Sequence, residues 1–102
     1  MRNVISHLDG SHLQTVPIST PADLNVQLDL AFASMTTLGT EPRWQRIEWL
    51  TRIRAALVRA NADLASLMAH EVGKPVMLGR AELDRATTLI DQTIAEMMTM
   101  SG

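Results

Sequence analysis

The chain has 102 residues and a mass of 11.2 kDa, which suits one small domain. Its 46% hydrophobic and 20% charged residues are typical of a globular protein rather than a disordered one. A net charge of −2 gives no support to a nucleic-acid or membrane partner, and the lack of cysteine excludes a disulfide scaffold, a thiolate metal site and a cysteine nucleophile within this chain.

Residues 1–20 predict an extended arm or a short β-hairpin, separate from the helical segment at 21–102. The pair Asp9-Gly10 favours a tight type I′ turn, in which both central residues need a positive φ. Residues 4–8 and 11–16 would form the two strands. No long apolar run follows Met1 or occurs later, so we expect neither a targeting signal nor a membrane helix, and a cytoplasmic protein.

The first predicted helix begins after Thr20, whose hydroxyl suits the N-cap position. Pro21 fits the first helical position and Asp23 places an acid in the first turn. Gly39 is expected to end the helix. One apolar stripe follows helical spacing: Leu24, Leu28, Ala31, Phe32 and Met35.

The rest of the chain predicts three more helices. The first of them starts near residues 40–42, and its apolar stripe is Ile47, Leu50, Ile53, Leu57 and Val58. Residues 61–63 indicate a break, followed by a short helix that ends at Gly73. The last helix is expected to run from about residue 76 to residue 100. Gly79 would weaken it by about 1 kcal/mol relative to alanine. The predicted fold is therefore mainly α with a short N-terminal hairpin.

Histidine and arginine residues suggest no catalytic or metal site. His7 and His12 flank the predicted turn, but only Asp9 is near them as a further ligand, so surface histidines are the expected reading. His70 receives no catalytic role, because a cation near a helix end is favoured anyway. Five arginines scatter around the second helix, which predicts solvated charges and one or two structural ion pairs rather than a nucleic-acid surface: Arg43, Arg46, Arg52, Arg54 and Arg59.

Cofactor motifs are also missing from the sequence. It contains no Gly-x-Gly-x-x-Gly turn and no Walker-type loop, and Gly73-Lys74 lacks the upstream glycine and the following Ser or Thr of a phosphate loop. We therefore assign no catalytic, cofactor-binding or metal residue. The seven methionines, three of them at 97, 98 and 100, indicate a surface that faces another part of a larger protein.

Several motifs, in order, resemble the N-terminal region of the aldehyde dehydrogenase superfamily. Ala31-Phe32 is similar to the family's Ala-Phe pair, and Arg46 followed by Leu50 to its Arg-x-x-x-Leu. Residues 61–67 resemble the stretch before the family's Glu-x-Gly-Lys-Pro. The remaining matches are Glu71, Gly73, Lys74 and Pro75 of that motif, and Glu82 in the segment that follows it.

This resemblance implies NAD(P)-dependent oxidation of aldehydes to acids by the intact family, through a cysteine nucleophile that this chain lacks. The chain would correspond to the opening helical layer of that α/β fold, with structural roles only. We expect Arg46 to pair with Glu71 or Glu82. The expected partners are the remainder of an aldehyde dehydrogenase, or other copies through exposed apolar helices. The alternative is a freestanding helical module that binds a protein partner.

Overall fold

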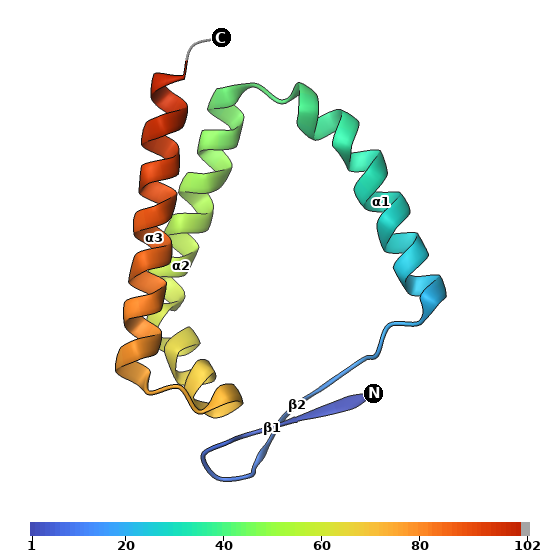
Figure 1. Cartoon of the computed structure of the whole chain (residues 1–102), viewed down its shortest axis with the longest axis vertical. Helices are drawn as coiled ribbons and strands as arrows, with labels where there is room; N and C mark the ends of the chain where they lie inside the picture. The colour runs from blue at the N-terminus through green and yellow to red at the C-terminus, as the bar shows by residue number, and fades with distance from the viewer. Residues whose placement is uncertain (101–102) are drawn as a thin grey trace.

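The computed structural model describes residues 1–100 and is mainly helical, with a hairpin at its N-terminus, as the sequence predicts. Figure 1 shows the hairpin below, one helix standing apart, and two helices side by side. The elements are β1 (Arg2–Ile5), β2 (His12–Val16), α1 (Pro21–Thr40), α2 (Arg43–Val72) and α3 (Val76–Thr99).

The hairpin is present, but the predicted type I′ turn is wrong. β1 and β2 pair antiparallel, with an irregularity between Val4 and Ile5, and a six-residue loop joins them. Gly10 alone in this loop has a positive φ, of 73°. Asp9 instead stabilises the loop through its carboxylate, which accepts hydrogen bonds from the backbone N–H of Ser11 at 2.9 Å and from its hydroxyl at 2.6 Å.

Helix α1 starts where the sequence predicts and ends slightly later. Thr20 and Asp23 form a capping box, in which each side chain accepts from the other residue's backbone N–H, at 3.2 and 2.8 Å. The expected stop at Gly39 is wrong, because Gly39 stays helical and the helix runs to Thr40. It ends there because Pro42 disfavours a helical conformation for Glu41, which is extended.

Helix α2 is continuous, so the predicted break at residues 61–63 and the separate short helix are wrong. Asn61 lies inside α2, and its side-chain amide donates to the Asp84 carboxylate of α3 at 3.1 Å. The Asn61 side chain thus forms a tertiary hydrogen bond within a continuous helix. Gly73 does end α2, in a left-handed conformation with φ 70°.

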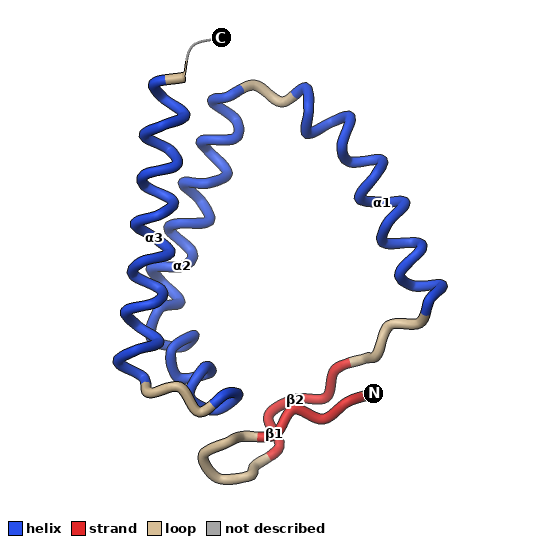
Figure 2. The backbone as a smooth tube through the Cα atoms, viewed as in Figure 1, coloured by secondary structure: helices blue, strands red, loops and turns tan. Residues whose placement is uncertain are grey.

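The closest packing lies between α2 and α3, which run side by side (Figures 1 and 2). Ala65 and Ala69 of α2 and Leu83 of α3 are the buried apolar side chains, and Gly79 is buried among them. A Cβ at Gly79 would lie 3.4 Å from both the Cα and the Cβ of Ala65. Gly79 is therefore a point of close helix approach, which the sequence analysis treated only as a weak point.

The fold is open and flat. It measures 52 × 39 × 15 Å and has a radius of gyration of 18.0 Å, whereas a compact chain of this length has about 13 Å. Its accessible surface of 7854 Å² exceeds the roughly 5,700 Å² expected for a compact protein of this mass by about 2,000 Å². Helix α1 contains no buried residue and does not pack along α2 or α3. Much apolar surface is thus left without a partner.

Candidate functional site

The turn between α2 and α3 carries three of the six motif residues: Gly73, Lys74 and Pro75. The N–H of Gly73 donates to the Ala69 carbonyl at 3.0 Å, and the Pro75 carbonyl accepts from the N–H groups of Leu78 and Gly79, at 2.9 and 3.0 Å. The turn therefore satisfies the Ala69 carbonyl near the end of α2 and starts α3 within three residues. As predicted, Gly73 is the helix stop and Lys74-Pro75 leads into the last helix.

Lys74 forms an ion pair with Glu82 across this turn. The hydrogen bond from Lys74, together with its charge, lowers the pKa of Glu82. Glu71, at the end of α2, is exposed. Of the two carboxylates in the motif region, Glu82 on α3 is therefore already paired with Lys74.

The expected pairing of Arg46 with Glu71 or Glu82 is wrong. The Arg46 guanidinium instead donates to the backbone carbonyl of Leu38, in the last turn of α1. A cation at the C-terminal end of a helix interacts favourably with its unpaired carbonyls. Arg46 and Glu71 are 25 residues apart on one helix, which corresponds to roughly 37 Å along its axis. The six motif residues therefore do not form a single site.

A polar contact between the hairpin and α2 was missed by the sequence analysis. Ser6 is 3% exposed, and its hydroxyl oxygen lies 2.9 Å from Nδ1 of His70. The same hydroxyl accepts from the Leu8 N–H at 3.1 Å, and the His7 N–H donates to the His70 carbonyl at 2.6 Å. These residues are 64 positions apart, so no local pattern could have joined them. This contact fixes the hairpin to the end of α2.

Two of the five arginines of α2 form ion pairs, in line with the predicted one or two structural pairs. Arg54 contacts Asp91 of α3 with two hydrogen bonds, at 2.5 and 3.0 Å, which raise the pKa of Arg54. Arg52 pairs with Glu48 one turn earlier, at 2.8 Å. Both pairs are largely exposed, so solvent screens them and each contributes little to stability.

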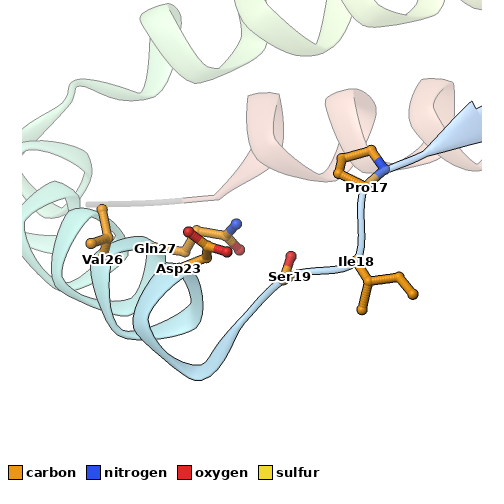
Figure 3. Close-up of a pocket in the computed structure, with 6 residues that line it drawn as sticks. All are labelled: Pro17, Ile18, Ser19, Asp23, Val26 and Gln27. Carbon is orange, nitrogen blue, oxygen red and sulfur yellow. The ribbon is translucent and has the colours of Figure 1, made fainter. Parts of the chain in front are cut away.

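His12 and a shallow hollow also lie in the N-terminal part of the chain. His12 Nε2 lies 2.9 Å from the Thr15 hydroxyl, and residues 1–100 hold no group of three or more His, Cys, Asp or Glu side chains arranged for a metal. A shallow hollow lies beside the start of α1, where Figure 3 shows Asp23 next to Gln27. Asp23 there is already the partner of Thr20 in the capping box. None of the helices within residues 1–100 is long and apolar enough to cross a membrane.

Two apolar stripes, one exposed and one exposed or half-buried, are the main candidate for a functional surface. The first, the α1 stripe, consists of Leu24, Leu28, Ala31, Met35 and Leu38, all exposed. The second, the outer stripe of α2, lies roughly opposite Ala65 at 100° per residue and consists of Trp49, Ile53, Ala56, Ala60, Leu64 and Leu67. Stripes of this length on a small protein mark surfaces that contact other protein.

Comparisons with known proteins support the motif-based resemblance. A search of curated proteins gave no significant match. The sequence model of the aldehyde dehydrogenase family matches residues 1–102, which is the whole chain. The motif turn at residues 71–75 and the helical architecture therefore belong to a recognised family pattern, and this chain is a member of the aldehyde dehydrogenase family.

Proposed function

We propose that this chain is an N-terminal structural segment of an NAD(P)-dependent aldehyde dehydrogenase, and that its helices cover other parts of such an enzyme. The observation that carries the proposal is the family match over residues 1–102, on a fold that exposes about 2,000 Å² more surface than a compact protein. A segment that normally packs against further protein accounts for both facts.

Helix α1 supports this proposal because it is apolar on two sides. The α1 stripe occupies one side, and Val26 and Leu30, at 59% and 65% exposure, lie on the other. A helix that is apolar nearly all round is typical of one buried on more than one face. In a larger enzyme, α1 would therefore be enclosed by protein on both sides.

The described residues do not fit the cofactor that the family implies. Gly79 is the one glycine in the first turn of a described helix, and it is buried against Ala65, so its backbone cannot approach a pyrophosphate. In the turn before α3, Lys74 is paired with Glu82 and Pro75 has no N–H to offer. We therefore propose that cofactor binding and the reaction depend on groups outside these 102 residues.

Activity measurements test the proposal directly. Purified chain is incubated with NAD or NADP and a panel of aldehydes, while the near-UV absorbance of the reduced cofactor is followed against a boiled control. We expect no turnover from the chain alone. If the reading frame continues into the remaining part of a family member, adding that part in trans should give activity. Turnover that follows the 11.2 kDa species through gel filtration would contradict the proposal.

A complementation control separates burial of α1 from general destabilisation. Leu28→Asp places a charge on the α1 stripe at a position that is 66% exposed here, and Asn25→Asp adds the same charge on a polar side of α1. We expect Leu28→Asp to weaken the activity recovered in trans and Asn25→Asp to leave it unchanged. Full recovery of activity with Leu28→Asp would mean that the α1 stripe does not contact the rest of the enzyme.

A freestanding interaction module remains the second candidate function. The observation that favours it is the exposure of three methionines on and after α3, at 80%, 65% and 61% for Met77, Met98 and Met100. Flexible methionine side chains suit surfaces that bind varied partners. A downstream frame that encodes the family's cysteine and its glycine-rich cofactor loop would contradict this alternative.

A further inference from the structure

We propose that the bond between Asp9 and Gly10 is a site of spontaneous backbone modification, at which the peptide link moves to the side-chain carboxyl of Asp9 and the hairpin is released from α2. The proposal does not depend on the enzymatic function proposed above. It rests on the open surroundings of this bond, on the hydrogen bonds that occupy both reacting groups, and on the loop's position beside the contact between Ser6 and His70.

The reaction needs only water and the groups of these two residues. The backbone nitrogen of Gly10 attacks the side-chain carboxyl carbon of Asp9, and a new C–N bond closes a five-membered succinimide ring. The carboxyl OH and the amide hydrogen leave together as water. Water then opens the ring at either carbonyl, which gives back the original link or gives an isoaspartyl link with an additional carbon in the backbone. The water that was lost is regained, so the mass is unchanged.

Position and sequence distinguish Asp9 from the other aspartates of the chain. Asp9 lies in a loop and precedes glycine, whereas the others lie within helices and precede leucine, arginine or glutamine. A side chain on the following residue hinders the backbone nitrogen from reaching the carboxyl carbon, and glycine has no side chain. Asp9 and Gly10 are both exposed, and a Cβ added at Gly10 would meet no atom within 4 Å. The ring therefore has space to close, and water can reach it.

The folded loop keeps both reacting groups in their unreactive forms. Ring closure needs a protonated carboxyl and an amide nitrogen that has lost its hydrogen. The Gly10 N–H donates to the Ser6 carbonyl at 3.0 Å, which retains that hydrogen. The Asp9 carboxylate accepts from the hydroxyl and the backbone N–H of Ser11, at 2.6 and 2.9 Å, and these bonds lower the pKa of Asp9. We therefore expect the reaction to proceed mainly when the loop opens.

Modification of this bond would alter the loop that positions Ser6. Two backbone hydrogen bonds close the loop, from the Ser6 N–H to the Ser11 carbonyl at 2.8 Å and from the Gly10 N–H to the Ser6 carbonyl at 3.0 Å. An additional backbone carbon between Asp9 and Gly10 changes the spacing of these donors and acceptors. The Ser6 hydroxyl oxygen lies 2.9 Å from Nδ1 of His70, so the polar contact between the hairpin and α2 depends on the same loop. The isoaspartyl form should therefore release the hairpin from α2.

Peptide mapping by mass spectrometry tests the site, because electron-transfer fragmentation distinguishes the two links. The chain is incubated at neutral pH, both folded and unfolded in urea. We expect isoaspartate at Asp9 rather than at the helical aspartates, and slower accumulation in the folded chain. Ser11→Ala removes the hydroxyl donor to Asp9 and should speed the reaction of the folded chain about threefold or more, without changing the rate in urea. Ser66→Ala, at an exposed position on α2, is the matched control and should change neither rate.

Hydrogen exchange tests the release of the hairpin. The isoaspartyl form is separated from the unmodified chain by chromatography, and we expect residues 2–16 to exchange faster in the isoaspartyl form. Asp9→Glu keeps the charge and cannot close a five-membered ring, so its hairpin exchange should stay constant during the same incubation. No isoaspartate at Asp9 in urea, equal rates in the folded and unfolded chain, or equal hairpin exchange in the two forms would each overturn the proposal.

Discussion

Larger side chains at Gly79 should distinguish two effects on stability: the gain in helix propensity over glycine, and the steric cost of the close packing between α2 and α3. A Cβ at this position would lie 3.3 Å from the Met68 sulfur and 3.4 Å from the Ala65 Cα. Gly39, inside α1, has nothing within 4 Å of the same added atom. The two glycines thus share a helical backbone and differ in their surroundings, so substitutions at Gly39 serve as controls for those at Gly79.

The magnitudes follow from these distances. Alanine gains about 1 kcal/mol over glycine in a helix interior, and the flexible Met68 side chain can move by the few tenths of an ångström that Gly79→Ala requires. We therefore expect Gly79→Ala to stabilise the chain by about 0.5–1 kcal/mol. Gly79→Val pushes two further carbons toward the Ala65 backbone and should destabilise it by about 1–3 kcal/mol. Gly39→Val should change stability by less than about 0.5 kcal/mol.

Denaturant unfolding followed by far-UV dichroism gives these free energies, at one fixed protein concentration because association would shift the midpoint. A change of 1 kcal/mol corresponds to a shift of about 4–8 °C in the melting temperature of a domain this small. If Gly79→Val were tolerated as well as Gly39→Val, the close approach of α3 to Ala65 would not exist in solution, and the argument for tight packing at Gly79 would fail.

Two further predictions concern the capping box and the hairpin contact. The pKa of Asp23 lies below its ordinary value of 3.8, because its carboxylate accepts hydrogen bonds from the backbone N–H of Thr20 and, with a smaller effect, from the Thr20 hydroxyl. The stability that Asp23 gives to α1 is therefore present above about pH 4 and is lost as the pH falls through the lower pKa of the folded state. Far-UV dichroism on acidification should therefore show α1 losing helix content, and Asp23→Asn should have a smaller loss; an equal loss in both would contradict the cap. Ser6→Ala should loosen the hairpin by about 1–3 kcal/mol, because it leaves the Leu8 N–H and His70 without their partner. Hydrogen exchange of residues 2–16 measures this effect, and Ser66→Ala, at an exposed position on α2, should leave the exchange unchanged.

The elements that could be predicted from the sequence are those set by residues a few positions apart. The start of α1 follows from Thr20, Pro21 and Asp23, and the structure shows the capping box that this pattern predicts. The end of α2 at Gly73 and the start of α3 after Pro75 follow from similarly local rules. In both places, the side chain or backbone geometry that decides the conformation lies within the same turn of the chain.

Predictions failed where a distant residue or a competing local rule decided the outcome. The sequence predicted a break at residues 61–63, but α2 continues and Asn61 bonds Asp84 of α3. Arg46 was assigned a carboxylate because it lies beside the apolar arc, whereas the nearby Leu38 carbonyl is its acceptor. Ser6 and His70 meet only because the hairpin lies against the end of α2. At Gly39, the restriction imposed by Pro42 sets the helix end rather than the glycine.

The motif at residues 71–75 has a structural role, because contacts that join the hairpin, α2 and α3 lie around it. Gly73 lies next to the hairpin, where a Cβ would sit 3.8 Å from the Cβ of His7. Lys74 ties the turn to α3 through Glu82, and the turn places Gly79 against Ala65. At the other end of α2, α1 remains exposed, and the outer stripe along α2 is exposed or half-buried. The motif therefore holds the hairpin, α2 and α3 in one arrangement, and that arrangement presents the two apolar stripes to a partner.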